Sequence, residues 1–454
     1  MARLWRRSLC SAWVAAIYFV IGIINTSHAN ISLTLPVSSH KNLLNQEVVI
    51  DHGYVSDFSR KGLLVLSSKL YYQGTEIYRY PEDKQAIDQL NQQKQQDRLM
   101  LSGLPVHEIK VGDRLENIMG RVVALKPITI AVADYQLRTS AVEPPYQHST
   151  RELKFSLLNL ENYFNGEQGR FSKSRGAKNK TQFKRQHNKL VATLQALNAD
   201  VIALNEIEND GNGNDSAIHE LSEALTKATG SSYRFIKTGQ KLGTDAITVG
   251  QMYRSDRVRP VGSAHSLSFD YLHRPLLLQQ YQFQGNYFYF ATTHLKSKGG
   301  KCRNDRKEKM YFAACNQQRV KASKKILSYL STHTQATKKG LPQLPVILMA
   351  DLNSYSKEPP LLVFESAGFL RAWDLAANEP LAAGYRFQGA MGNLDHALLN
   401  TAAQAVFKKR TSWAINSLYS DSLGYRHLKS DSPAVATPIR SSDHDPLSIV
   451  VNFD

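Results

Sequence analysis

From residue 151 to residue 454 the chain alternates runs with the length of buried strands and runs of helical periodicity. The strand-like runs are apolar and rich in β-branched and aromatic residues; they lie at 154–158, 200–204, 247–253, 287–293 and 346–349. The helical runs lie at 183–197, 217–229 and 319–330. Strands that alternate with helices over about 300 residues predict an α/β (α+β) domain built on mixed sheets.

Residues 41–140 differ from this pattern, because they contain short strand-like runs separated by turns. These runs, at 48–50, 62–66, 98–101 and 120–125, predict a compact β-barrel or a small sandwich. The polar, glutamine-rich stretch 83–96 predicts an exposed helix or loop. The stretch 111–115 resembles the start of an oligonucleotide-binding fold, a five-stranded barrel that can hold single strands. A barrel that only packs on its neighbour is an equal alternative.

Two adjacent prolines, Pro144 and Pro145, exclude both helix and central strand from residues 141–150. We therefore expect a linker there. It would separate the β-rich domain from a second domain at 151–454.

The first 29 residues have the three parts of a secretory signal: a basic start, an apolar stretch from Leu9 to Ile24, and a cleavage site after Ala29. An uncleaved anchor is the alternative, but the apolar stretch is shorter than the roughly 20 residues that a spanning helix needs. We expect a secreted protein, extracellular or periplasmic, without stable membrane insertion after cleavage.

The formal charge of the chain is +17, and removal of the three arginines of the signal would leave +14. An excess of this size favours a polyanionic partner: nucleic acid, anionic lipid or acidic glycan.

Cys302 and Cys315 are the two cysteines that remain after the signal is removed. In an oxidising compartment we expect them to form a disulfide, with two free thiols as the alternative. No neighbouring Cys or His completes a set of four zinc ligands.

Polar side chains that can bind a phosphate or a cation follow the apolar runs of the second domain. They are Asn159, Glu206, His294, Asp351 with Asn353, Asp395, and Asp443 with His444. Asp351 and Asn353 alternate, so on an extended chain both point to the same face. An aspartate next to a histidine, as in Asp443-His444, can hold a metal and move a proton. Their repetition at strand ends predicts that these side chains meet in one site.

In their order along the chain, these motifs resemble those of the endonuclease/exonuclease/phosphatase family, the fold of pancreatic deoxyribonuclease and of the abasic-site endonucleases. The resemblance covers about residues 150 to 454. Its motifs are Leu158-Asn159-Leu160-Glu161-Asn162, Leu204-Asn205-Glu206, Thr293-His294-Leu295-Lys296, Ala350-Asp351-Leu352-Asn353, Leu394-Asp395-His396 and Ser442-Asp443-His444-Asp445-Pro446. It implies a four-layered αββα sandwich with two packed mixed sheets, and hydrolysis of a phosphodiester with a divalent cation.

The extracellular bacterial nuclease branch of that family is more similar still, and in that branch an upstream β-rich domain is common. The similarity rests on Ile207-Glu208-Asn209, Gly243-Thr244-Asp245-Ala246-Ile247, His294-Leu295-Lys296-Ser297-Lys298-Gly299 and Trp413-Ala414-Ile415-Asn416.

The resemblance also implies a role for each side chain. Glu206, Asn159 and Asp443 would hold Mg²⁺, which prefers oxygen ligands, with Mn²⁺ or Ca²⁺ as substitutes. Asp351 would orient or deprotonate the attacking water. Asn353 would bind a non-bridging phosphate oxygen without repelling it.

Two histidines would transfer the protons. His444 would act as the general base or as a direct donor to the phosphate, and Asp395 would fix its tautomer. His294 would protonate the leaving oxygen. Related enzymes divide these roles differently, so the choice of acid and base stays open. The mechanism requires His444 and Asp395 to lie within hydrogen-bonding reach.

Two basic runs follow the strand ends at Asn159 and His294. They contain Arg170, Lys173, Arg175, Lys178, Lys180, Lys184 and Arg185, and Lys296, Lys298, Lys301, Arg303, Arg306 and Lys307. We predict that these runs follow a phosphate backbone, with a solvated face as the alternative. The predicted substrate-binding residues are Asn353, Lys296, Lys298, Arg175 and Asn416.

The leading functional hypothesis is a secreted, Mg²⁺-dependent nuclease, a hydrolase that cleaves DNA with low sequence specificity. Action on RNA, endo or exo preference and oligomeric state stay open. One alternative is a phosphodiesterase or phosphatase of the same fold that acts on a phospholipid or a small phosphate ester. Another is a non-catalytic nucleic-acid-binding surface protein.

Overall fold

The computed structural model describes residues 30–37, 42–59, 62–166, 171, 175–239, 241–269, 273–300, 302, 309–334, 343–376, 383–428 and 437–453. The expected secretory signal, residues 1–29, lies outside these residues. Within them, no helix combines the length and the apolar character needed to cross a membrane.

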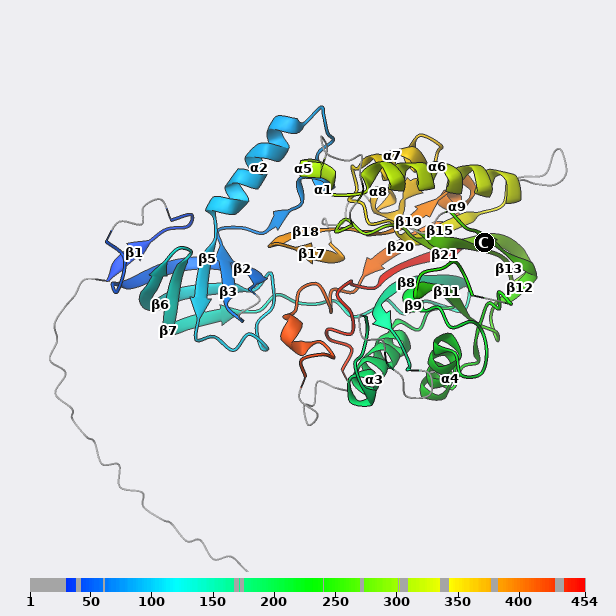
Figure 1. The fold of residues 1–454 in the computed structure, drawn as a ribbon, viewed down its shortest axis with the longest axis horizontal. Helices are drawn as coiled ribbons and strands as arrows, with labels where there is room; N and C mark the ends of the chain where they lie inside the picture. Colours follow the sequence, from blue (N-terminus) through cyan, green and yellow to red (C-terminus); the bar gives the residue numbers. More distant parts are fainter. Residues whose placement is uncertain are drawn as a thin grey trace, which may run out of the picture.

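Two six-stranded mixed sheets pack face to face in the larger part of the molecule (Figure 1). The first contains β8 (Glu152–Tyr163), β9 (Val201–Glu208), β10 (Tyr233–Phe235), β11 (Ile247–Arg254), β20 (Phe407–Ser412) and β21 (Leu447–Asn452), in the order β10-β11-β9-β8-β21-β20. The second contains β12 (Arg259–Leu267), β13 (Arg274–Phe283), β14 (Asn286–His294), β15 (Val346–Asp351), β16 (Leu370–Arg371) and β19 (Asp395–Leu399), in the order β12-β13-β14-β15-β19-β16.

Apolar side chains from both sheets, such as Phe155, Phe290 and Ile449, form the core between them. A second apolar cluster joins the first sheet to α3 (Lys180–Leu197) and α4 (Ala217–Thr229). A third joins the other sheet to α6 (Asn316–His333) and α7 (Pro359–Glu365). The predicted four-layered αββα sandwich is therefore confirmed. The shorter helices are α5 (Lys309–Phe312), α8 (Ala372–Leu375), α9 (Thr401–Ala405) and the 3-10 helix η2 (Asp421–Leu423).

Local signals in the sequence explain the bounds of α3. The side chain of Asn179 caps its start by accepting a hydrogen bond of 2.9 Å from the N–H of Gln182. Asn198 ends the helix in the left-handed conformation, with φ of 48°. Between them, Leu190 and Leu194 are fully buried against the sheet. The helix end thus returns the chain directly into β9.

The smaller, N-terminal part is a closed ring of strands. It contains β2 (Glu47–Phe58), β3 (Leu64–Ser67), β5 (Leu99–Ser102), β6 (Arg114–Leu125) and β7 (Ile128–Arg138). β2 pairs with both β3 and β6, β5 pairs with β3 and, in parallel, with β7, and the β6–β7 pairing closes the ring. β1 (Ile31–Leu33) adds to β2. Five strands in a closed ring match the barrel that the oligonucleotide-binding resemblance implied.

The glutamine-rich stretch forms α2 (Lys84–Gln96), a helix with one buried residue, Ile87. It stands outside the barrel and lies beside α5 of the sandwich (Figure 1). The sequence predicts an exposed helix or loop here, and the structure has a helix.

A small three-stranded sheet joins the barrel region to the sandwich. β4 (Tyr71–Tyr72), which precedes α1 (Gly74–Ile77), pairs in parallel with β18 (Ala390–Gly392). β18 in turn pairs with β17 (Tyr385–Phe387). Backbone hydrogen bonds therefore connect segments that lie more than 300 positions apart in the sequence.

Glu76, in α1, fastens the same junction. Its carboxylate accepts hydrogen bonds from the N–H and hydroxyl of Ser356, at 3.2 and 2.5 Å, and from the backbone and side-chain N–H groups of Asn393, both at 3.0 Å. All three residues are at most 4% exposed. A buried acceptor with four donors holds both loops of the sandwich against α1.

Replacement of Glu76 by glutamine should destabilise the fold, because an amide NH₂ cannot accept the hydrogen bonds that one carboxylate oxygen receives. We expect E76Q to lower the free energy of unfolding by about 1–3 kcal/mol, measured by urea denaturation. The exposed Glu82→Gln is the matched control and should change it by less than about 0.5 kcal/mol. Equal stability of E76Q and the wild type would contradict this role.

Candidate active site

Strand register brings three predicted site residues together at one edge of the sandwich. β14 and β15 run parallel, and their register places His294 opposite Asp351. β15 and β19 run antiparallel, and Asp351 lies opposite Asp395. The parallel pair β8–β9 ends at the same edge, where the Asn159 Nδ2 atom lies 3.2 Å from Asp351 Oδ2. The predicted convergence of polar strand ends is therefore present.

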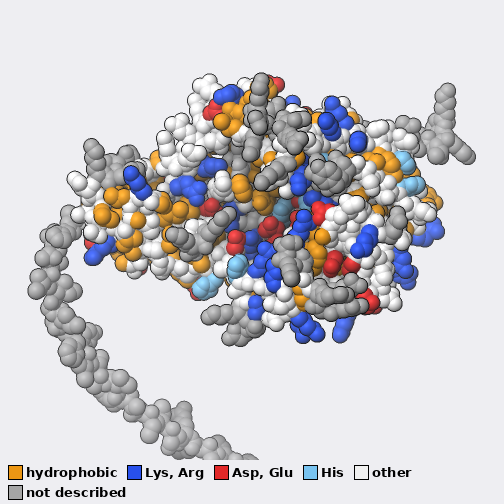
Figure 2. Space-filling model, viewed as in Figure 1, with side chains coloured by type: hydrophobic (Ala, Val, Ile, Leu, Met, Phe, Trp, Pro, Cys, Tyr) orange, Lys and Arg blue, Asp and Glu red, His pale blue; other side chains and the backbone are white. Residues whose placement is uncertain are grey.

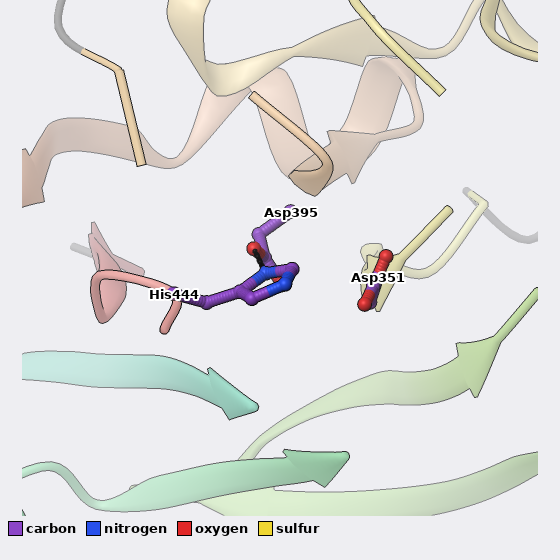
Figure 3. A group of neighbouring side chains, drawn as sticks. All are labelled: Asp351, Asp395 and His444. Carbon is purple, nitrogen blue, oxygen red and sulfur yellow. Dashed lines mark hydrogen bonds and ion pairs between the residues drawn. The ribbon is translucent and has the colours of Figure 1, made fainter. Parts of the chain in front are cut away.

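His444, in the turn before β21, contacts Asp395 directly. Its Nδ1 atom lies 2.5 Å from Asp395 Oδ2, and the imidazole faces that carboxylate (Figure 3). The predicted contact is confirmed. Burial lowers the pKa of His444, but the charges of Asp395 and Asp443 outweigh burial and raise this pKa well above its ordinary value. The carboxylate therefore fixes one ring nitrogen and favours the imidazolium.

Asp351 lies at the centre of the group. Its Oδ2 is 3.3 Å from His294 Nε2, and its Oδ1 accepts a hydrogen bond of 2.9 Å from the N–H of Asn353. Burial and then the neighbouring Asp395 raise the pKa of Asp351 to about 7. Asp351, Asp395 and His444 each offer a ligand atom, and these atoms lie within 4.8 Å of one another (Figure 3).

A second acidic group contains Glu206, Glu161 and Asp443. Burial and then the charge of Asp443 raise the pKa values of both glutamates, that of Glu161 to about 8. Glu206 is also 4.0 Å from His294 Nε2 and accepts a hydrogen bond of 2.7 Å from Asn162 Nδ2.

The backbone at these strand ends is unusual. Glu161, Asn162 and Glu206 have φ values of 52°, 59° and 62°, in the left-handed region that non-glycine residues rarely adopt. Asn353 shares this conformation, with φ of 47°. Residues held in this way concentrate at functional sites, because the surrounding structure must stabilise them.

The donors present fit a divalent cation. Glu161, Glu206 and Asp351 keep raised pKa values although Arg440, Arg274 and His444 lie near them, so the positive charge present is not sufficient and a cation would add to it. Asp395 Oδ1 is buried without a hydrogen-bond partner among the described residues, so it too is an available ligand atom. Of the predicted metal ligands, Glu206 and Asp443 lie in the acidic group, and the Asn159 side chain lies between the two groups, since it contacts Asp351 and hydrogen-bonds to Glu206.

The predicted substrate-binding residues have several different surroundings. Arg175 lies 2.6 Å from Asp245, and the Lys298 ammonium contacts both oxygens of Glu358 at 2.6 and 2.7 Å. Burial lowers the pKa of Lys298 to about 8. Lys296, two positions after His294, is half-buried. Their contact with substrate stays a prediction.

The amides predicted to bind substrate are both engaged within the protein. Asn416 is fully buried and donates to the backbone carbonyl of His444 at 2.6 Å. Asn353 Nδ2 donates to the carbonyl of Leu295 at 3.1 Å. Asn416 therefore holds the turn that carries His444. Of the basic runs, Arg170, Lys173, Lys301, Arg303, Arg306 and Lys307 lie outside the described residues.

Three residues of the site were not predicted from the sequence. Glu161 stood inside a motif, and its carboxylate two positions after Asn159 was a usable signal. Arg274 begins β13, is buried, and donates to the carbonyl of Leu295 at 2.9 Å. Burial is the main cause that lowers the pKa of His294 well below its ordinary value, and the positive charge of Arg274 is the second. The ring of Tyr385 lies 4.6 Å from that of His444, and no sequence pattern marks it.

Cys302 and Cys315 form the expected disulfide. The bond closes the segment that contains α5.

No protein-family model and no curated protein matches this sequence. Solved structures do show a likeness. A humanized D. rerio TDP2 has 17% identity and a TM-score of 0.43, over 67% of this chain and 100% of that one. The human Nocturnin catalytic domain with bound sulfate has 15% identity and a TM-score of 0.42, over 67% and 95%.

A family protein from Bacteroides thetaiotaomicron has 15% identity and a TM-score of 0.43, over 68% of this chain and 100% of that one. This chain is similar in structure to proteins of the endonuclease/exonuclease/phosphatase family, the family that its motifs resemble.

Proposed function

We propose that this protein is a secreted, Mg²⁺-dependent nuclease that hydrolyses phosphodiester bonds of DNA. The observation that carries the proposal is the convergence of two histidines and several carboxylates at one edge of the sandwich. His444 and His294 lie on either side of Asp351, with Asp395 bound to the first histidine and Glu206 beside the second. This set contains a candidate proton acceptor, a proton donor and oxygen ligands for a hard cation.

Glu206, Glu161 and Asp443 are the residues that we propose as ligands of the cation. A bound Mg²⁺ would offset the negative charge that develops on the phosphate. Glu161 takes the place that the family resemblance implies for Asn159, because Asn159 Oδ1, the atom that would bind a cation, accepts a hydrogen bond of 2.9 Å from the N–H of Glu161.

Asp351 is our candidate for orienting and deprotonating the attacking water. Its position is fixed from three sides by Asn159, His294 and the backbone of Asn353. A carboxylate with a pKa of about 7 can accept a proton near neutral pH.

His444 is our candidate proton donor to the phosphate or to the leaving oxygen. Asp395 binds its Nδ1, which leaves Nε2 for the substrate. His294, for which the family resemblance implies the role of acid, is a weaker candidate because burial and Arg274 favour its neutral form. We propose that it orients Asp351 and Glu206 instead.

The surface around the site supports a polyanionic substrate. Acidic side chains gather in the middle of the face shown in Figure 2, and lysine and arginine side chains surround them. The formal charge of the whole chain, +17, is positive like that of these surrounding lysine and arginine side chains. Such a ring attracts a phosphate backbone toward the carboxylates, whereas a lone phosphate ester needs a smaller basic surface. Export is supported by the signal-like residues 1–29 and by the disulfide.

Asp351→Ala and His444→Ala should each reduce Mg²⁺-dependent plasmid cleavage by roughly 10²- to 10⁴-fold, because each removes a group proposed to transfer a proton. DNA binding, measured by gel shift, should persist. The exposed His427→Ala is the matched control and should cleave as the wild type does. If the wild type cleaves no DNA with Mg²⁺ but releases phosphate from lipid head groups or small esters, the nuclease proposal is wrong and the phosphatase alternative holds.

The affinity of the metal-free protein for Mg²⁺ should rise with pH. Burial and Asp443 raise the pKa of Glu206, so at low pH a proton occupies the carboxyl that the cation requires. Isothermal titration should show tighter binding at about pH 8 than at about pH 5.5, with release of protons. Glu206→Gln should bind weakly at both values, and the exposed Glu223→Gln should match the wild type. Affinity that does not depend on pH would contradict the assignment of Glu206.

A further inference from the structure

A groove of about 900 Å³ leads from the candidate active site to α2 of the N-terminal part. The site contributes Asn353 and Tyr385 to its lining, and α2 contributes Asn91 and Lys94. The two walls belong to segments that lie far apart in the sequence. The groove exists only because the barrel region is fastened to the sandwich.

That attachment is direct along the groove. The Tyr80 ring stacks on that of Tyr311, in α5, with 4.1 Å between the ring centroids. The Tyr311 hydroxyl lies 3.2 Å from a carboxylate oxygen of Asp88, in α2. The disulfide closes the segment that carries Tyr311. The groove is therefore formed before any ligand binds, which lowers the entropic cost of binding.

The sandwich wall of the groove is aromatic. Tyr385 and Phe387 line it, and the Phe387 side chain is 50% exposed, whereas Tyr355 in the same lining is 5% exposed and lies under the Lys298 ammonium. Met310, which is 79% exposed, lies in the same lining. Exposed apolar side chains that gather in a groove are typical of a ligand-binding surface. Nucleic-acid bases can stack on such surfaces.

The α2 wall is polar and basic. Asn91, Gln92 and Gln95 present amides that both donate and accept hydrogen bonds, and Lys94 and Arg98 add positive charge. Lys94 has no ion pair among the residues that the structure describes, whereas Arg98 lies 3.7 Å from Asp57. Lys298, on the opposite wall, is neutralised by Glu358. Lys94 is thus the cation of this wall without a carboxylate partner among the described residues, although burial and the charge of Arg98 lower its pKa.

We propose that this groove binds a single-stranded segment of the nucleic-acid substrate, with bases on the aromatic wall and the phosphate backbone along α2. The proposal rests on the proposed nuclease function and extends it to the substrate class. Aromatic stacking needs unpaired bases, because the faces of bases in a duplex are covered by their neighbours. Only one residue of α2, Ile87, is buried, so packing does not account for the glutamine-rich sequence of this helix. Binding of nucleic acid by the amides would account for it.

Two substitutions test the groove without touching the proposed catalytic residues. Lys94→Gln removes a charge, and Phe387→Ala removes an exposed ring. Each should raise KM for cleavage of a single strand of about twelve nucleotides by roughly five- to a hundredfold, with little change in kcat. Hydrolysis of bis(p-nitrophenyl) phosphate, which is too small to reach α2, should stay unchanged and shows that the variants are folded. Lys126→Gln, at an exposed lysine outside the groove, is the matched control.

The outcomes separate this inference from the proposed function. Wild-type KM values for the single strand in both groove variants, with cleavage intact, would overturn the groove and leave the nuclease proposal standing. A defect limited to duplex plasmid would also overturn it, because paired bases would then be the ligand. Wild-type protein that cleaves neither DNA nor the small ester would remove the proposed function itself. A higher KM for the single strand alone would support the groove.

Discussion

The register of β14, β15 and β19 is the constraint on which the site depends. It places His294, Asp351 and Asp395 opposite one another on adjacent strands, and the Asp395 carboxylate then holds His444, which lies in the turn before β21 of the other sheet. A slip of one residue in β15 would turn Asp351 to the opposite face and move apolar side chains into the site. The apolar core between the sheets thus fixes the catalytic geometry as well as the fold.

The same register brings several negatively charged carboxylates close together, and neighbouring positive groups offset only part of their repulsion. The positive charge of His444 offsets the negative charge of Asp395, and the charge of Arg274 acts on both Glu206 and Asp351. Glu161 and Glu206 keep raised pKa values, and their backbones adopt a strained left-handed conformation. A site built for stability alone would avoid both features. Their coincidence at one edge is a physical reason to regard this edge, rather than any other polar patch, as the place of chemistry.

Much of this arrangement was predictable, because the alternation of side chains along a strand and the residue at the end of the strand can be read from the local sequence. The apolar run before Asp351 predicted both a buried strand and a polar residue at its end, and the structure has both. The contact between Asp395 and His444 followed from the family resemblance and is confirmed. Tyr385 could not be predicted in this way, because β17 and β18 have three residues each and too little sequence for a period. The pairing of β18 with β4 depends on tertiary contacts alone.

The unpredicted contacts link the barrel region to the chemistry. Glu76 binds Asn393, which lies two positions before Asp395, and Asn393 Oδ1 accepts a hydrogen bond from the N–H of Gly384 at 3.0 Å. Gly384 in turn accepts a hydrogen bond from the N–H of Asp445, the residue after His444, at 2.7 Å. A continuous set of hydrogen bonds therefore runs from α1 to Asn393 and Asp445, residues close in sequence to the two partners of the His444–Asp395 pair. These bonds fix the segments that carry Asp395 and His444, so the N-terminal part belongs to the structural support of the site and is more than an attached module.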